Sequence, residues 1–160
     1  MIFFKKKISS KEMARGLYHA MISNTIKTDL RDQDGNVILT MKEQSLMLAQ
    51  YLYNLVERSN LDELKVHILL TYVVNNYEHK MKEDSTIYMA VSLVEFNKVR
   101  DYVKNVLSES HKFFSDAFLF GKDLDFTQKT LVVVWYVEQC KIIDSTFELG
   151  LKNFKIVDKE

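Results

Sequence analysis

Polar side chains that could do acid–base chemistry recur on one side of a segment predicted to be helical, residues 61–80. At about 100° per residue, helical spacing gathers them into one stripe. The members of this polar stripe are Glu63, His67, Thr71, Asn75 and Glu78. Because an unperturbed histidine titrates at about pH 6.5, His67 is suited to carry a proton or to donate a ligand nitrogen. Two interpretations follow: the stripe lines a cleft between helices, or it is the solvent-facing side of its helix.

Glu95 is a second candidate acid or base, because it falls between Val91 and Val99 in a segment of apolar periodicity. A buried carboxylate without a partner has a raised pKa and becomes a candidate for proton transfer. Ser92 precedes Glu95 by three residues, which is also the spacing of a helix-capping box. The competing interpretation is therefore a helix that begins near Ser92, with Glu95 bonded to the backbone there.

Metal and nucleophile chemistry find little support in the sequence. None of the histidines His19, His67, His79 and His111 has a Glu or Asp three residues before it, the pattern of helical di-metal sites. Cys140 lies on the apolar side of its predicted helix, where a cysteine usually behaves as a small hydrophobe. The chain has no glycine-rich phosphate loop and no dinucleotide fingerprint. We therefore expect no catalytic residue, no metal and no cofactor, and we favour a protein that is not an enzyme.

The segment 29–40 resembles a calcium-binding loop only in composition. Such loops need an acidic first position, a glycine at the sixth and a bidentate glutamate at the twelfth. Placing Gly35 sixth puts Leu30 first and Met41 twelfth, so both ligand positions fail. We expect a solvated turn here. The alternative is a small hairpin, closed by the Asp34-Gly35 pair, between Leu30 and the segment 37–39.

The elements that must position these residues are predicted to be helices. The chain has no proline, although average usage would give roughly eight, and only four glycines. Proline is excluded most strongly from helix interiors. Apolar periodicity predicts helices over residues 10–28, 41–58, 61–80, 86–107, 109–120 and 126–149. Capping signatures precede four of them, at Ser9…Glu12, Thr40…Glu43, Asn60…Glu63 and Asp125…Gln128, and Gly150 is predicted to end the last helix.

We therefore expect an all-α fold: a single-domain antiparallel bundle of five or six helices over residues 1–160, with frayed tails at 1–8 and 155–160. Residues 61–80 are apolar over most of the helical circumference, so this helix is expected near the centre. The segments 66–74 and 132–134 are rich in β-branched residues, which leaves strands as the alternative. Each lies within a longer amphipathic window, which favours helix.

Charge and cysteine content narrow the class of protein. The 22 basic and 22 acidic residues cancel, so the chain lacks the general positive charge with which proteins grip nucleic acid. A single cysteine excludes an intrachain disulfide. No uncharged apolar stretch approaches the length of about 18 residues that a membrane span needs. We expect a cytoplasmic protein without a transmembrane segment and without a nucleic-acid partner.

The densest aromatic cluster lies within residues 111–126 and offers a contact surface. Its candidate residues are Phe113, Phe114, Phe118 and Phe120. Such rings either plug one end of a bundle or form an exposed patch for a partner. The first functional hypothesis is a non-enzymatic interaction or regulatory module that binds a protein partner, or a second copy of itself, through an apolar helix face or this patch. The alternative is a bundle that holds a small apolar or amphipathic ligand in its core, with acid–base chemistry at His67 or Glu95.

Overall fold

The computed structural model describes residues 5–77 and 122–157 of the chain. The α-helices within these ranges are α1 (Ser10–Tyr18), α2 (Met41–Arg58), α3 (Asp62–Tyr77) and α6 (Phe126–Asn153). A single π-helical turn, η1 (His19–Ser23), continues α1. The strands are β1 (Lys6–Ile8), β2 (Leu30–Arg31), β3 (Val37–Leu39) and β4 (Phe154–Ile156).

The prediction of an all-α bundle of five or six helices is wrong, because the described residues form four α-helices together with short strands. The predicted helices over 86–107 and 109–120 lie outside those residues. The mostly helical character does follow from the composition. The terminal strands β1 and β4 were missed because each has only three residues, too short to leave a recognisable period in the sequence. The strands β2 and β3 form the hairpin that was the alternative to a solvated turn.

Three of the predicted helix starts are confirmed by complete capping boxes. Ser9, Thr40 and Asp125 each accept a bond from the backbone of the residue three positions on, and the side chain there bonds back to the cap. These reciprocal bonds satisfy two backbone donors that a helix start leaves without partners. α2 has the bounds that the sequence predicts.

The fourth capping signature, Asn60…Glu63, is wrong, because Asn60 belongs to the motif that closes the C-terminal end of α2 and does not begin α3. Asn60 has a φ of 56°, in the left-handed region. Its amide donates to the carbonyl of Glu57 at 3.1 Å, and the amide of Leu61 donates to that of Val56 at 3.5 Å. This pair of bonds is a Schellman motif, in which asparagine can take the place of glycine.

Two helices end elsewhere than predicted. The helix predicted over 10–28 changes at His19 into the π-helical turn, where the amide of Asn24 donates to the carbonyl of His19 at 3.0 Å. α6 continues through Gly150 to Asn153, so this glycine does not end it. Helical glycine costs only about 1 kcal/mol, and packing of the surrounding helix can offset that amount.

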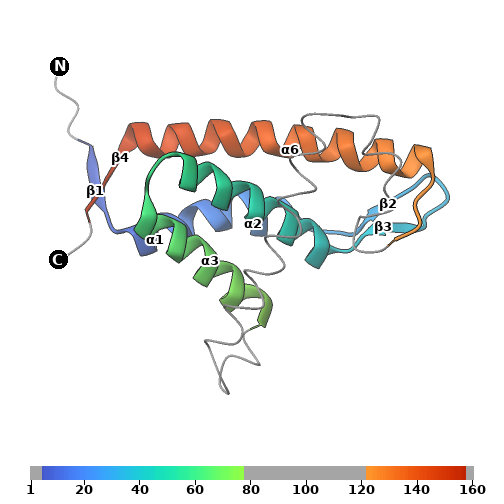
Figure 1. Cartoon of the computed structure of the whole chain (residues 1–160), viewed down its shortest axis with the longest axis horizontal. Helices are drawn as coiled ribbons and strands as arrows, with labels where there is room; N and C mark the ends of the chain where they lie inside the picture. The colour runs from blue at the N-terminus through green and yellow to red at the C-terminus, as the bar shows by residue number, and fades with distance from the viewer. Residues whose placement is uncertain (1–4, 78–121, 158–160) are drawn as a thin grey trace.

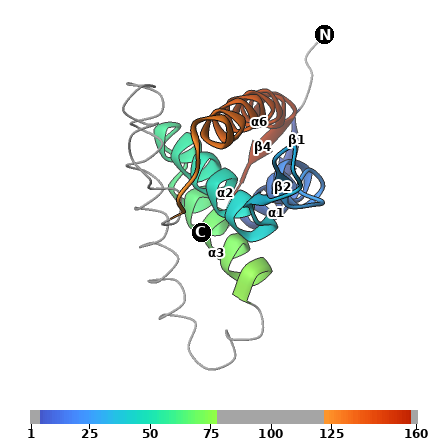
Figure 2. The same ribbon diagram turned by 90° about the vertical axis from the view of Figure 1, so that its right-hand side faces the viewer.

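The helices lie in layers of unequal size (Figures 1 and 2). α6 runs the length of the molecule along one side, and α1 and α2 lie beneath it. α3 packs against α1 and α2 on the side away from α6. The prediction that this helix lies near the centre is wrong, because Val66 and Val74 on α3 are 45% and 43% exposed. The core therefore sits between α6 on one side and α3 on the other.

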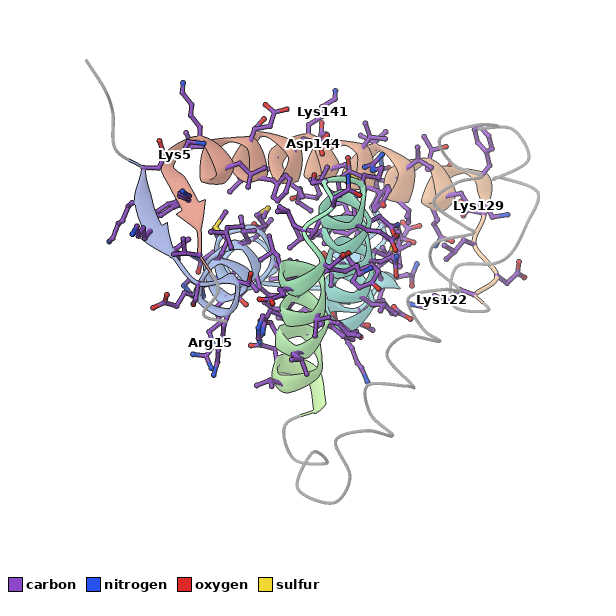
Figure 3. All side chains as sticks on the ribbon, turned by 60° about the vertical axis from the view of Figure 1, so that its left-hand side comes forward. Lys5, Arg15, Lys122, Lys129, Lys141 and Asp144 are labelled. Carbon is purple, nitrogen blue, oxygen red and sulfur yellow. The ribbon has the colours of Figure 1, made fainter. Side chains whose placement is uncertain are left out.

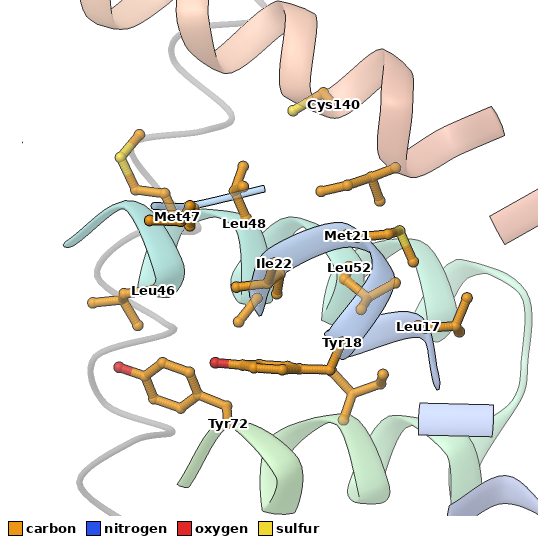
Figure 4. Close-up of a cluster of buried hydrophobic side chains, with 14 of the residues drawn as sticks. Leu17, Tyr18, Met21, Ile22, Leu46, Met47, Leu48, Leu52, Tyr72 and Cys140 are labelled. Atoms are coloured by element: carbon orange, nitrogen blue, oxygen red, sulfur yellow. The ribbon is translucent and has the colours of Figure 1, made fainter. Parts of the chain in front are cut away.

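Side chains from every layer fill this core (Figure 4). α1 and η1 contribute Tyr18 and Met21, α2 contributes Leu48 and Leu52, and α3 contributes Tyr72. All five are at most 3% exposed. At about 1.5–3 kcal/mol for each large apolar side chain, their burial is the main favourable contribution to folding.

Two small sheets close the opposite ends of the molecule (Figure 1). β2 and β3 pair antiparallel, with Gly35 in their turn at a φ of 85°, so the hairpin forms where a solvated turn was expected. β1 and β4 pair parallel, with Lys6 opposite Phe154 and Ile8 opposite Ile156. The prediction of frayed tails is therefore wrong for residues 6–8 and 155–156. Residues 1–4 and 158–160 lie outside the described part.

Candidate binding groove

Two side chains of the polar stripe of α3 bond to backbone carbonyls of their own helix. Glu63 and Asn75 are exposed, while His67 and Thr71 are half-buried. The Thr71 hydroxyl donates to the carbonyl of His67 at 2.7 Å, and the Asn75 side-chain amide donates to that of Thr71 at 2.8 Å. Short polar side chains within helices often bond this way. None of the described stripe residues lines either of the two grooves described below.

Several predicted site residues lie outside the described part of the chain. These are Glu78 of the stripe, the candidate acid Glu95, and the aromatic patch of Phe113, Phe114, Phe118 and Phe120. They stay predictions. Phe126, at the edge of the same aromatic cluster, is described: it is the first residue of α6 and is 70% exposed.

At the hairpin end, Asp32 links β2 to the start of α6. Its carboxylate accepts the amides of Asp34 and Asn36 at 3.0 and 2.8 Å, and the side-chain amides of Asn36 and Gln128 at 3.0 and 2.8 Å. The side-chain bond from Asn36, followed by that from Gln128, holds the pKa of Asp32 below its ordinary value. Asp32, one of the acidic residues in the segment 29–40 that resembles a calcium-binding loop in composition, is therefore a structural acceptor.

Two further side chains fasten the hairpin to the helices. The buried Gln44 donates to the carbonyls of Thr28 and Leu39 at 2.9 and 3.3 Å. Lys122 donates to the carbonyl of Ile38 at 2.9 Å and pairs with Glu43 at 2.5 Å. These bonds tie together the hairpin, the start of α2 and the segment before α6.

A groove of about 450 Å³ lies between this hairpin and α6. Its lining residues are Arg31, Asp32, Gln33, Phe126, Thr127, Thr130, Leu131 and Val134. The charged groups that line it already have partners, because Arg31 donates to the carbonyl of Gly35 at 2.8 Å and Asp32 accepts the bonds given above. The groove therefore presents mainly apolar and hydroxyl groups.

A second groove, of about 290 Å³, separates α1 from α6 near the other end, and we call it the α1–α6 groove. Its lining residues are Ile8, Glu12, Met13, Gly16, Leu17, Ala20, Thr146, Leu149, Gly150, Asn153 and Phe154. Met13 and Leu17 are buried, whereas Gly16 and Ala20 are exposed and Leu149 is 56% exposed. Apolar side chains thus line a groove that solvent can enter.

Two glycines shape this groove in different ways. A Cβ added to Gly150 would lie 2.6 Å from the Cε of Met13, so the absence of a side chain lets α1 and α6 approach closely. A Cβ added to Gly16 would meet no atom within 4 Å. Gly16 is therefore not needed for packing of the described residues, and its missing side chain leaves the groove open.

The terminal sheet borders the same groove. Ile8 of β1 and Phe154 of β4 line it, and Ile8 also packs against the core. Lys5, Lys6 and Lys7 are exposed beside it. Lys5 lies at the C-terminal end of α6 (Figure 3) and donates to the carbonyl of Leu151 at 2.7 Å. This end of the molecule therefore combines an apolar groove with a basic margin.

Midway along α6, titratable side chains form part of the packing between helices. The Tyr51 hydroxyl donates to Asp144 at 2.7 Å, and the ring of Tyr51 meets that of Tyr136 edge-on at 6.1 Å. Burial is the main cause that raises the pKa of Tyr51. Burial also raises the pKa of the Cys140 thiol to about 12, so this cysteine is a poor nucleophile at neutral pH. Cys140 is buried, as its place on the apolar side of α6 predicts.

Sequence reasoning missed the α1–α6 groove. Most of its residues are small or apolar, and they come from positions about 130 apart, so no local motif marks them. A signal was present in Gly16, which interrupts a helix that its pattern otherwise predicts well. A glycine inside a helix often has a packing or functional reason. Gly150 was noticed but interpreted as a helix end.

Among the described residues there is neither a cluster of metal-ligating side chains nor a helix that could span a membrane. Within residues 5–77 and 122–157, no three His, Cys, Asp or Glu side chains are grouped so as to hold a metal ion. None of the helices in that part is long and apolar enough to cross a membrane. What remains is a small, mostly helical protein with surface grooves at its two ends. No protein-family model, curated protein or solved structure matches the chain.

Proposed function

We propose that this protein is a non-enzymatic interaction module that receives an apolar segment of a partner protein in the α1–α6 groove. The observation that carries the proposal is the open space at Gly16, where an added Cβ would meet nothing within 4 Å, beside Leu149 at 56% exposure. Exposed apolar surface lined by small residues can bury a partner's side chain without rearrangement.

The filled core favours this function over a ligand held between the helices. Tyr72, Leu48 and Leu52 meet in the core with no exposed surface. The half-buried members of the polar stripe, His67 and Thr71, are joined through a bond along α3. A ligand site of the predicted kind would need convergent polar groups around a cavity. An open groove between two helices suits the side chains of another protein better.

The charges beside the groove favour a foreign partner over a second copy of this chain. Lys5, Lys6 and Lys7 lie exposed on the terminal sheet, and Lys155 lies opposite Lys7 in the register. Two copies that met through this end would bring like charges together, which is unfavourable once water is excluded. A partner with acidic residues beside its apolar segment avoids that cost.

Site-specific photo-crosslinking in the cell that makes the protein tests this function. A photoreactive amino acid at Ala20 or at Leu149 should capture a distinct partner. The matched control is Ile142, which is 48% exposed on the same helix as Leu149 but lines neither groove. We expect crosslinks of one size from both groove positions and none of that size from Ile142.

Filling the groove provides the second arm of the test. Gly16→Leu should fold normally, because the position is helical and open, and it should abolish the crosslinks at Leu149. Equal capture by Ile142, or capture that persists in a folded Gly16→Leu variant, would contradict the proposal. Light scattering of the purified protein identifies any crosslinked product that is only a dimer of this chain.

A further inference from the structure

We infer that the outer edge of β1 accepts an acidic, extended segment of the partner as a third strand of the terminal sheet. This inference rests on the proposed function, because it names the chemistry of the partner that enters the α1–α6 groove. It is carried by the open edge of a two-stranded parallel sheet and by the lysines along that edge.

The terminal sheet is incomplete by ordinary standards. Parallel sheets are usually buried and larger, and a sheet of two strands is only marginally stable by itself. Within residues 5–77 and 122–157, the strands of this sheet are β1 and β4. A strand at a sheet edge presents unpaired amide and carbonyl groups, which form a template for another chain.

The register identifies the backbone groups that are open. The amide of Val157 donates to the carbonyl of Ile8 at 2.8 Å, so the backbone groups of Ile8 face β4. Successive residues of a strand direct their backbone groups to opposite edges. The amide and carbonyl of Lys7 therefore face the outer edge, which lies on the side away from β4 and the helices (Figure 3).

The side chains along this edge define the charge of the incoming strand. Lys6 and Lys7 are exposed on opposite faces of β1, because side chains alternate along a strand. Lys155 lies beside Lys7 on the same face, since paired residues of neighbouring strands share a face. An acidic side chain of an added strand would therefore lie beside a lysine, whichever face of the sheet it is on. A second copy of β1 would place lysine opposite lysine, so the lysines disfavour pairing between copies.

The edge and the groove are continuous through one residue. Ile8 ends β1 and also lines the α1–α6 groove. A partner segment whose apolar side chain enters the groove can therefore continue beside β1 in an extended conformation. Backbone bonds to the edge would add affinity, while the groove and the lysines would select the sequence.

The first test uses three fluorescent peptides of about ten residues and the full chain. One peptide alternates Val and Glu, a second alternates Val and Lys, and the third is the Val–Glu peptide with N-methyl groups on alternate backbone nitrogens. We expect saturable binding of the first, at least tenfold weaker binding of the second, and loss of binding by the third. Binding of the first should weaken as salt rises, because exposed charges are screened.

The second test compares Lys7→Pro with Lys7→Val. Both substitutions remove the charge, but only proline removes the outward amide, and proline is tolerated where a strand's N–H faces solvent. We expect Lys7→Val to weaken binding of the Val–Glu peptide a few-fold, and Lys7→Pro to weaken it at least tenfold more. Melting curves check that both variants are folded. The N-methylated peptide asks the same question of the unmodified protein should Lys7→Pro not fold.

The outcomes separate this inference from the proposed function. Equal binding by the two folded Lys7 variants, equal binding of the N-methylated peptide, or no binding of the Val–Glu peptide would overturn strand addition. If Gly16→Leu still abolishes crosslinking while Lys7→Pro does not, the result supports binding in the groove and contradicts strand addition. If Lys7→Pro abolishes both peptide binding and crosslinking but Gly16→Leu changes neither, the result supports strand addition and contradicts binding in the groove.

Discussion

The two ends of the molecule each carry a short sheet, but they are fastened in different ways. At the hairpin end, Asp32, Gln44 and Lys122 reach across to other elements, and each makes at least two bonds there or within the turn. At the terminal end, Lys5 makes a single exposed bond to the carbonyl of Leu151 beside an open groove. Both ends carry a groove, but one end is cross-linked by buried and half-buried polar groups, whereas the other leaves a backbone edge accessible beside its groove.

This difference suggests separate roles for the two ends, stability at one and binding at the other. Bonds made by buried side chains are costly to lose, so the elements that they join stay in one arrangement. An open sheet edge and an unfilled groove contribute little to stability and leave groups available to a partner. Removing a bonded polar side chain at the hairpin end should therefore lower stability, while removing one at the terminal end should mainly change binding.

The largest effect is expected from Gln44→Leu at the hairpin end. The substitution keeps the volume approximately but removes the donor from the carbonyls of Thr28 and Leu39, at a position only 4% exposed. Losing a buried donor costs about 1–3 kcal/mol. We expect the free energy of unfolding to fall by that amount in urea denaturation followed by circular dichroism.

Lys5→Met is the matched control at the terminal end. It also removes a side-chain donor from a backbone carbonyl, that of Leu151, but the site is exposed and water can replace the bond. The midpoint of urea denaturation should barely change, as for most surface substitutions. If Lys5→Met destabilised the protein as much as Gln44→Leu, the two ends would be fastened equally and the comparison would fail.

An intermediate effect is expected from alanine at the two glycines of the α1–α6 groove. Gly16→Ala should stabilise the protein by about 1 kcal/mol, because alanine favours helix and the new Cβ meets nothing within 4 Å. Gly150→Ala has the same helical gain, but its Cβ would lie 2.6 Å from the Cε of Met13, a buried side chain that must then shift. We expect its gain to be cancelled wholly or in part.

Thermal melts of the two glycine variants measure this difference directly. Equal stabilisation would mean that Met13 yields without cost and that α1 and α6 are not held close at Gly150. Destabilisation by Gly16→Ala would mean that the groove is filled in the free protein. The second result would remove the argument that the terminal end is built open.

Much of the fold could be predicted because it depends on local sequence. The capping boxes at Ser9, Thr40 and Asp125 and the bounds of α2 follow from interactions within a few residues. Asn60 was misread because the same residue type serves at the start and at the end of a helix, and only its positive φ distinguishes the two. Local patterns identify helices better than they identify where each one stops.

The candidate site could not be predicted, because it depends on contacts between distant residues. β1 pairs with β4 across about 150 positions, and the groove joins Gly16 to Leu149. Apolar periodicity predicts which face of α6 is buried, but not which neighbour leaves part of it uncovered. The polar stripe of α3 attracted attention because His67 is a reactive residue type, although its neighbour Thr71 bonds back to the helix itself.

The smallest effect is expected from acid, through Asp32 at the hairpin end. Its bonds lower the pKa below the ordinary value of 3.8, so the folded state holds the carboxylate charged. That stabilisation is fully present above the ordinary pKa and is lost as the pH falls through the lowered pKa. The difference in unfolding free energy between the unmodified protein and Asp32→Asn should thus be constant from about pH 7 to pH 5, and should shrink below about pH 4.

Glu12→Gln is the counterpart of Asp32→Asn at the terminal end. The pKa of Glu12 is also lowered, first by its bond from the Ser9 amide, and the hydrogen bonds of this carboxylate are those of the capping box of α1. Glutamine can serve in the same box, so its acid-dependent difference should be smaller than that of Asp32→Asn. Urea titrations at about pH 7, 5 and 3 measure both differences. A larger acid dependence at Glu12 would show that the terminal end carries the more important charged bond, contrary to the contrast between the two ends.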